Sequence, residues 1–423
     1  MNLHRCAAAV LALVLTANLT SCAAKQEPSS QVFPAENAAS GTAAVSSSEA
    51  EHTPADLSGT VSVSDLRTLV SEANRADYDF TDKALEYLVQ IGENYPNRNV
   101  SDKGTHDVFS SWLIGELEAC GYASGQIEEQ PFSQTSLYDG VVKGRNIILT
   151  VPGQTNAGQI IVGAHYDGDG AGDNGSGVAL LLATAAGLAG TTPQLTIRYI
   201  FFDAEEEGML GSKYYAEHMS EEEIASTVYM INLDALAFGD FCNIYGGIYG
   251  DDYDADYIAV VEGEPLPEPE HTEGYDFAAN AAETLGFRVY RTTDLDGYYA
   301  EHGRGMDPED AFFTNPWTNA NPAPMNMIAP SPATFGASDH TGFAVRGIPY
   351  IYFEATNWWA EGSDPAVAFT GYPETYDTAL GDGGQFMNTE YDTLAQLEQL
   401  FPGRAEQHYR LFSPLLSALL LVG

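Results

Sequence analysis

Potential metal ligands follow a short apolar run near the middle of the chain. Residues 159–163 are continuous and β-branched, which predicts a buried strand, and His165 and Asp167 follow this run directly. A turn rich in glycine and aspartate then leads to Asp173. Imidazole and carboxylates, with no usable thiolate beside them, are ligands that suit zinc and similar divalent ions.

Two further apolar runs end in the same way. Residues 195–202 predict a second buried strand, which is followed by Glu205 and Glu206. Residues 228–233 predict a third strand, which is followed by Asp234. Ligands of open α/β sheets bind outside the carboxyl ends of the strands, so we expect these side chains to meet at one edge. Each residue alone suits a solvated loop of an acidic protein, whereas the joint pattern favours a metal site.

Helical and strand-like segments surround these runs. The spacing of apolar residues predicts helices at 66–73, 81–95, 105–120, 178–188, 212–218, 275–285, 394–400 and 405–422, and further strands at 146–151 and 348–353. This alternation predicts an α/β fold in a single large domain. Residues 239–335 are rich in Tyr, Gly, Pro and Asp and predict a long irregular insertion beside the site.

The N-terminal residues carry the features of an export signal. Arg5 precedes an apolar core at residues 7–15, and a Leu-Thr-Ser-Cys tetrad ends at Cys22. The tetrad resembles a bacterial lipobox, in which the cysteine is lipidated; the alternative is a plain secretory signal with a chance cysteine. The apolar core is shorter than the roughly 20 residues that span a bilayer. We expect an extracytoplasmic protein at the cell surface, anchored by lipid to the bacterial membrane.

The composition divides the chain into three consecutive parts. Residues 1–21 are expected to form the signal peptide, and residues 22–60 a flexible tether, because they contain few large apolar groups. Residues 61–423 are expected to form the folded domain with its insertion. Cys120 and Cys242 remain as thiols whose pairing stays open, since two cysteines make no disulfide framework.

The overall charge limits the partners of the protein. The formal net charge of −43 opposes binding to nucleic acids and to anionic lipids, because phosphates would be repelled. We therefore expect no nucleic-acid partner and membrane contact only through the lipid anchor. Separately, we expect a monomer.

Five motifs in a fixed order carry a family resemblance. They are Ala164-His165-Tyr166-Asp167, Asp173-Asn174-Gly175-Ser176-Gly177, Ala204-Glu205-Glu206 with Gly211-Ser212, Asn232-Leu233-Asp234, and Ser338-Asp339-His340. Together they resemble the co-catalytic zinc aminopeptidase family, metallopeptidase family twenty-eight, which includes secreted bacterial aminopeptidases, glutamate carboxypeptidase and glutaminyl cyclase. The resemblance covers roughly residues 81–400. It implies a twisted, mostly parallel mixed sheet with helices on both faces, zinc as cofactor, and peptide substrates.

The resemblance also implies a role for each motif residue. It makes His165 and Asp234 ligands of one zinc ion, Asp173 the bridge between two ions, Glu206 a ligand of the second ion, and Glu205 the general base. A carboxylate has two oxygens and can bridge ions about 3.5–4 Å apart, which an imidazole cannot do. Three further residues, Asp167, Asp339 and His340, are expected to support the ligands, with Asp167 orienting the imidazole.

Two positions depart from the family pattern. The second zinc ion of the family takes a histidine from a motif of the form His-Thr-x-x-Asp-Thr, and Asn388 stands at that position here. An amide oxygen is a poorer zinc ligand than an imidazole, so the number of zinc ions, one or two, stays open. His340 is an alternative ligand, but structural support is the favoured interpretation. Phe335 replaces a tyrosine that stabilises the oxyanion in some relatives.

The sequence therefore predicts a metal-dependent peptide hydrolase, an aminopeptidase that acts outside the cell. One alternative is a glutaminyl-cyclase-like aminoacyltransferase with a single zinc ion. The other is a lipid-tethered binding protein on a catalytically weakened scaffold. An assay for ammonia release from a peptide with N-terminal glutamine separates the first alternative from the hydrolase.

Overall fold

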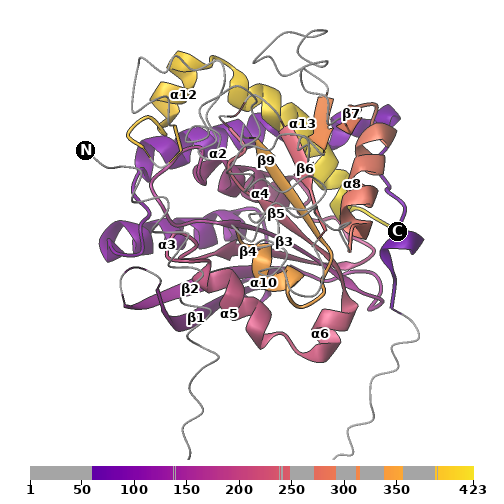
Figure 1. Ribbon diagram of the computed structural model, residues 1–423, viewed down its shortest axis with the longest axis horizontal. Helices are drawn as coiled ribbons and strands as arrows, with labels where there is room; N and C mark the ends of the chain where they lie inside the picture. The colour runs from indigo at the N-terminus through magenta and orange to yellow at the C-terminus, as the bar shows by residue number, and fades with distance from the viewer. Residues whose placement is uncertain are drawn as a thin grey trace, which may run out of the picture. The chain divides into compact units, whose positions relative to one another are not determined.

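A nine-stranded mixed sheet forms the centre of the molecule (Figure 1). The computed structural model describes residues 60–136, 138, 140–237, 239, 242–247, 271–291, 311–314, 338–355, 386–387 and 389–423, all within the compact unit Leu57–Gly423. The strands are β1 Ile127–Thr135, β2 Val141–Val151, β3 Gln159–His165, β4 Thr196–Phe202, β5 Thr227–Leu233, β6 Cys242–Tyr245, β7 Arg288–Arg291, β8 Ala311–Thr314 and β9 Tyr350–Ala355. Their order across the sheet is β1-β2-β4-β3-β5-β9-β6-β8-β7.

Parallel pairing dominates the middle of the sheet. Strands β4, β3, β5 and β9 run parallel to one another, and so do β6, β8 and β7. The pairs β1–β2, β2–β4 and β9–β6 are antiparallel. The central strands β3 and β5 are buried along their whole length, as expected for parallel strands covered on both faces.

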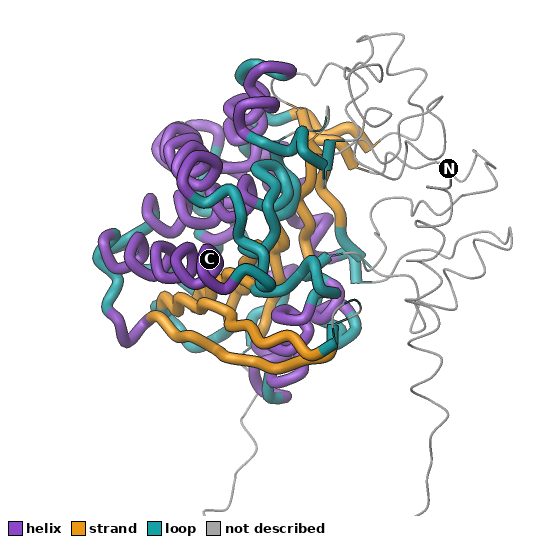
Figure 2. The backbone as a smooth tube through the Cα atoms, turned by 90° about the vertical axis from the view of Figure 1, so that its left-hand side faces the viewer, coloured by secondary structure: helices purple, strands orange, loops and turns teal. Residues whose placement is uncertain are grey.

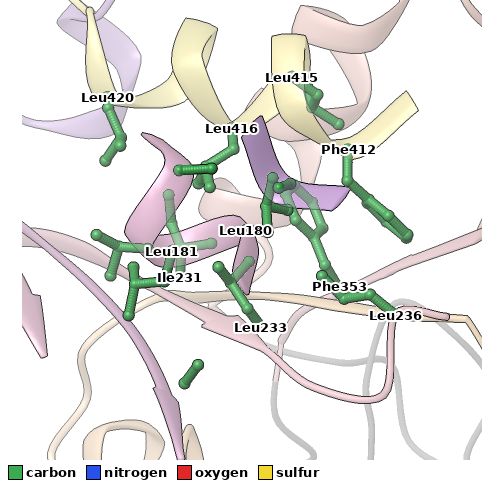
Figure 3. Packing of buried hydrophobic residues seen from close by; sticks show 14 of the residues in the cluster. Leu180, Leu181, Ile231, Leu233, Leu236, Phe353, Phe412, Leu415, Leu416 and Leu420 are labelled. Carbon is green, nitrogen blue, oxygen red and sulfur yellow. The ribbon is translucent and has the colours of Figure 1, made fainter. Parts of the chain in front are cut away.

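One face of the sheet carries the thicker layer of helices (Figure 2). Helices α2 Thr81–Asn94, α3 Lys103–Ala119, α4 Gly175–Gly187, α8 Glu273–Thr284 and α13 Arg404–Leu420 share one apolar core with the residues of the strands that point to this face. In Figure 3, Phe412 and Leu416 of α13 lie against Leu180 of α4, with Ile231 and Phe353 of the sheet beside them. The apolar C-terminal run thus packs in the core.

The opposite face is covered by three shorter helices. They are α5 Leu210–His218, α6 Glu221–Ser226 and α10 Thr341–Ala344. Phe202 of β4 packs there against Tyr215 of α5 and Phe343 of α10, with ring centroids 6.4 and 6.0 Å away. The predicted α/β class, with a mostly parallel mixed sheet and helices on both faces, is confirmed.

Most predicted elements lie where the apolar pattern places them, including α12 Leu394–Leu400. The prediction of a helix at residues 66–73 is wrong. Arg67 donates its backbone N–H to the carbonyl of Gly423, and Thr68 forms a β-bridge with Val422, so pairing with the C-terminal end prevails over the local helical spacing. The short 3-10 helices η3 Val63–Asp65 and η4 Glu72–Tyr78 flank this stretch.

The stretch predicted as an irregular insertion contains regular structure. Helix α8 lies close to the helix predicted at 275–285, while β6, β7 and β8 extend the sheet at one side and were not predicted. The other residues of 239–335 lie largely outside the described ranges, as do the expected signal peptide and Cys22. Within the described part of the chain, every helix is too short or too polar to cross a bilayer.

The chain leaves β3 and β4 in opposite directions across the sheet. Strand β3 connects through α4 to β4 on one side, and β4 connects through α5 and α6, on the other face, to β5 beyond β3. Such a reversal opens a crevice outside the carboxyl ends of the strands. The end of β3 lies at that point.

Candidate metal centre

Three side chains from separate segments converge at the carboxyl end of β3. His165 is the last residue of β3, Asp234 follows β5 directly, and Asp173 lies in the loop before α4. The Nε2 atom of His165 is 3.2 Å from Oδ1 of Asp173 and 3.4 Å from Oδ1 of Asp234. One ligand atom from each residue lies within 4.8 Å of the other two.

The spacing and chemistry of these atoms fit a divalent metal ion. Ligands at about 2.0–2.1 Å from a tetrahedral zinc ion are separated by about 3.3–3.4 Å, close to the distances from the imidazole to both carboxylates. Neither ring nitrogen of His165 nor Oδ1 of Asp234 has a well-formed hydrogen bond to the described residues, although all three atoms are buried. Buried polar atoms left without partners are costly, and a cation between Nε2 of His165 and Oδ1 of Asp234 would satisfy both of these atoms, while Nδ1 faces Asp167.

The charge balance of the cluster points the same way. Burial alone would lower the pKa of His165, but the charge of Asp234 and the contacts with neighbouring carboxylates raise it well above its usual value. Burial, reinforced by Asp234, raises the pKa of Asp173. Burial likewise raises the pKa values of Glu205 and Glu206 well above their usual range. The carboxylates thus demand a positive charge, which a proton on His165 supplies unless a metal ion replaces it.

Asp167 links the imidazole to the loop after β4. Its Oδ1 atom lies 3.6 Å from Nδ1 of His165 and accepts the backbone N–H of Glu205 at 2.9 Å. Its Oδ2 atom accepts the backbone N–H of Glu206 at 3.3 Å. The carboxylate of Asp167 therefore contacts the ring nitrogen of His165 that points away from the cluster. It also holds the backbone N–H groups of Glu205 and Glu206.

Asp234 is held by a short chain of hydrogen bonds. The hydroxyl of Ser338 donates to Oδ2 of Asp234 at 2.7 Å and accepts from the amide of Asn232 at 2.7 Å. Burial alone would raise the pKa of Asp234, but the charge of His165 and the Ser338 hydrogen bond outweigh it, so the pKa falls. Oδ1 of Asp234 is thereby left to face the cluster.

The neighbours of Ser338 have different surroundings. Asp339 is buried, and burial raises its pKa to about 7, while the charge of His165 acts in the opposite direction. The ring of His340 stacks on Tyr350 and Tyr352, with centroids 4.4 and 4.9 Å apart, at the start of α10. His340 therefore lies in an aromatic stack and outside the group of His165, Asp173 and Asp234.

The structure brings together some, but not all, of the predicted site residues. His165, Asp173 and Asp234 form the cluster, and Glu205 and Glu206 lie on the adjoining loop. Glu206 approaches Gly168, where a Cβ would lie 3.1 Å from its Oε1, and it is not one of the three clustered ligands. Asn388 and Phe335 lie outside the described residues.

Sequence reasoning missed two contributors to the site. Ser338 belongs to the Ser-Asp-His motif, so its place beside a ligand was within reach of the sequence. Arg98 is fully buried beside the loop that carries Asp173, and no spacing pattern indicates it.

Comparison with protein families identifies the stretch that holds the cluster. Residues 146–263 match the model of peptidase family M28. His165, Asp173 and Asp234 all lie in this stretch, as do Glu205 and Glu206. The resemblance to metallopeptidase family twenty-eight that the motifs carry is confirmed.

Curated relatives match the same part of the chain. A probable lipoprotein aminopeptidase of Mycobacterium tuberculosis, LpqL, is 31% identical over 161 residues, which are 37% of this chain and 31% of the relative. The aminopeptidase YwaD of Bacillus subtilis is 29% identical over 165 residues, 38% of this chain and 33% of the relative. The chain thus spans about a third of the length of these relatives.

A solved structure resembles the fold over a longer stretch. The crystal structure of an Acidobacteriales bacterium glutaminyl cyclase matches with a TM-score of 0.51 and 17% identity, covering 81% of this chain and 95% of that chain. At this identity the likeness shows a shared fold.

Proposed function

We propose, on the premise of the match to peptidase family M28, that the chain is a metal-dependent peptide hydrolase that releases N-terminal residues outside the cell. The convergence of His165, Asp173 and Asp234 beside the loop of Glu205 carries this proposal. The names of the relatives, which are aminopeptidases, support the choice of an exopeptidase.

Zinc is the proposed cofactor. His165, Asp173 and Asp234 would supply three protein ligands, the number that catalytic zinc sites use while they keep one position open. Glu206, from the neighbouring loop, and Asn388 are the proposed ligands of a second ion bridged by Asp173. A bound ion supplies a Lewis acid that polarises the peptide carbonyl and makes water more acidic.

The protein itself moves the proton in this proposal. Glu205 accepts the proton of the attacking water and returns it to the leaving amine. Asp167 accepts the backbone N–H of Glu205 and contacts the ring of His165. It therefore fixes the position of the base relative to the metal ligand. The carboxylates around the site provide acceptors for the free α-amino group of a peptide.

Replacement of the base tests the mechanism. Glu205→Gln should lower turnover of aminoacyl substrates by about 10²–10⁴-fold while zinc stays bound, because it removes the proton acceptor and no ligand. Turnover with a panel of fluorogenic aminoacyl substrates and zinc content by elemental analysis are the two measurements.

A neighbouring acid provides the matched control for this test. Glu207 has the same side chain two residues further on, but its carboxylate accepts a hydrogen bond from Ser136. Glu207→Gln should retain near-normal turnover. A fully active Glu205→Gln protein would refute the assignment of the base.

Glutaminyl cyclase chemistry is the second proposal. A cluster of three ligand atoms suits a single zinc ion, which is the observation that favours this alternative. Ammonia release from a peptide with N-terminal glutamine, without cleavage of aminoacyl substrates, would establish the cyclase instead. Zinc binding without either reaction would indicate a binding protein.

The proposed location is the outer face of the bacterial membrane. The lipobox-like tetrad ending at Cys22 supports a lipid anchor, and one relative is named a lipoprotein aminopeptidase. Residues 1–21 would be removed, residues 22–60 would tether the domain 61–423, and the protein would act as a monomer. Mass spectrometry of the mature N-terminus should find a lipidated Cys22, and an unmodified Cys22 would contradict the anchor.

A further inference from the structure

The loop that carries Asp173 is held from one side by a buried arginine. Arg98, in the segment between α2 and α3, is 1% exposed. Its Nε donates to the carbonyl of Tyr166 at 3.1 Å, and one terminal nitrogen donates to the carbonyl of Gly170 at 2.7 Å. The backbone N–H of Arg98 donates to the carbonyl of Gly168 at 2.8 Å. Carbonyl groups at three positions around the loop thus share one partner residue.

The same loop is held from its other side by an aspartate distant in sequence. Oδ1 of Asp392 accepts the backbone N–H of Gly172 at 2.6 Å, and Oδ2 accepts that of Asp173 at 2.9 Å. The carbonyl of Asp392 accepts the N–H of Ala171 at 3.0 Å. A Cβ at Gly170 would collide with the carboxylate of Asp392, so the loop backbone lies directly against it.

These contacts are complementary in polarity. Arg98 binds only carbonyl groups of the loop, and Asp392 binds only its N–H groups through side chain and backbone. The carboxylate of Asp392 accepts the backbone N–H of Asp173. Oδ1 of Asp173 lies 3.2 Å from Nε2 of His165. A rotation of that peptide would swing the carboxylate away from the cluster. Asp392 therefore acts on the backbone of the ligand Asp173 itself, and Arg98 acts on the residues of the loop that precede it.

We propose that Arg98 and Asp392 are positioning residues that hold the loop of Asp173 in the conformation required for metal binding. The proposal rests on the metal site of the proposed function. Groups that orient ligands from outside the metal contribute about 10–100-fold to metal affinity. Without the contacts of Arg98 and Asp392, the loop of Asp173 would become ordered only when the metal binds. The conformational entropy lost in that step would weaken the metal affinity.

Asp392→Asn is the direct test in the full-length protein. The amide keeps the volume of the side chain but offers one acceptor where two N–H groups need one each. Zinc affinity, measured on metal-stripped protein by competition with a chelator, should fall about 10–100-fold. The melting temperature of the metal-free protein should change no more than in the control variant.

Ser413→Ala is the matched control. The hydroxyl of Ser413 accepts the backbone N–H of Phe80 at 2.7 Å, so this variant also deprives a backbone N–H of its side-chain acceptor, but away from the loop. Zinc affinity should stay within about twofold of the wild type. Equal losses of affinity in Asp392→Asn and Ser413→Ala would overturn the proposal, as would an unchanged affinity in Asp392→Asn.

Two further measurements keep the test independent of the folding of one variant. Arg98→Lys retains the positive charge but not the forked donors, and it should lose at least about tenfold in zinc affinity. In the metal-free wild type, hydrogen exchange of a peptide covering residues 170–174 should be as slow as that of buried strands. Exchange at the rate of an unstructured peptide would overturn the proposal.

The outcome separates this inference from the proposed function. If the wild type binds zinc but hydrolyses no peptide, and Asp392→Asn binds zinc more weakly, the positioning role of Arg98 and Asp392 is supported and the hydrolase is refuted. A wild type that binds no zinc refutes both.

Discussion

The chemistry at the scale of single residues follows from an excess of carboxylates around one imidazole. His165 contacts Asp173 and Asp234 on one side and Asp167 on the other. Glu205 lies on the loop that Asp167 holds. Because like charges in a buried site repel strongly, such a group is stable only with a cation or with protons on several of its members. The same imbalance that makes the site costly would favour the binding of a divalent cation.

A buried histidine outside the group of His165, Asp173 and Asp234 makes the stability depend on pH. Nδ1 of His408 donates to the carbonyl of Leu236 at 2.9 Å. Burial lowers the pKa of His408 to about 3, and the charge of Arg404 acts in the same direction. The folded protein thus favours the neutral ring, so the contribution of His408 to stability is complete above about pH 6.5 and is lost as the pH falls from there towards 3.

We predict a loss of about 1.4 kcal/mol of unfolding free energy per pH unit from this group over that interval. His408→Gln keeps a donor for the carbonyl and should remove this slope in urea denaturation measured between pH 4 and 7. His218→Gln is the control, because the exposed His218 ring also contacts a backbone carbonyl, at 2.7 Å. Equal slopes in the wild type and His408→Gln would contradict the prediction.

Residue types at strand ends predicted that five side chains, including Glu205 and Glu206, would meet at one edge, and three of them lie within 4.8 Å of one another. His165, Asp173 and Asp234 are polar groups that interrupt apolar segments, and parallel strands bring such positions to one edge. Arg98 and Asp392 were beyond this reasoning, because they bind backbone atoms. A contact with a carbonyl or an N–H group leaves no trace in the identity of its partner residue.

At the scale of elements, a buried pair of side chains helps to hold helix α3 against the sheet. Nε2 of His106 lies 2.8 Å from Oδ1 of Asp203 just after β4, and Oδ2 accepts the backbone N–H of Arg145 on β2 at 2.8 Å. Burial disfavours the charged ring, but the hydrogen bond and charge of Asp203 outweigh it and raise the pKa of His106. The pair joins one helix to two strands beside the loop of Glu205.

We expect His106→Ala to destabilise the protein by about 3–5 kcal/mol, because it leaves the Asp203 carboxylate buried without its charged partner. The double variant His106→Ala/Asp203→Asn should lose less than the sum of the single variants, since it removes both members of the pair. Urea unfolding of all four proteins gives the coupling. Additive losses would show that the two residues act independently.

The elements that the sequence predicted are those with a continuous apolar pattern. Strands β3, β4 and β5 are nearly completely buried and consist mostly of apolar residues, with Arg198 in β4 and Asn232 in β5 as exceptions. Strand β1 escaped prediction because most of its residues are exposed and polar, and β6, β7 and β8 have four residues each. Such short strands are stabilised by pairing with distant neighbours, which a local pattern does not record.

At the scale of the whole molecule, the metal site lies where four distant parts of the chain meet. His165 ends a central strand, Asp173 lies in the loop before the helix that follows, and Asp234 directly follows the neighbouring strand. Asp392 reaches the same loop from close to the C-terminus. A cation bound there would connect these parts, so its binding free energy would add to the stability of the entire sheet.

Removal of the metal should therefore lower the melting temperature as well as the activity. Zinc at about 100 times its dissociation constant contributes about 2.7 kcal/mol, and for a domain of roughly 360 residues each kcal/mol shifts the melting temperature by about 1–2 °C. Calorimetry before and after treatment with a chelator should show a fall of several degrees that added zinc reverses. In His165→Ala, which lacks the imidazole ligand, chelation should cause no shift. Unchanged melting of the stripped wild type would mean that the carboxylates tolerate one another without a cation, which their burial and mutual distances oppose.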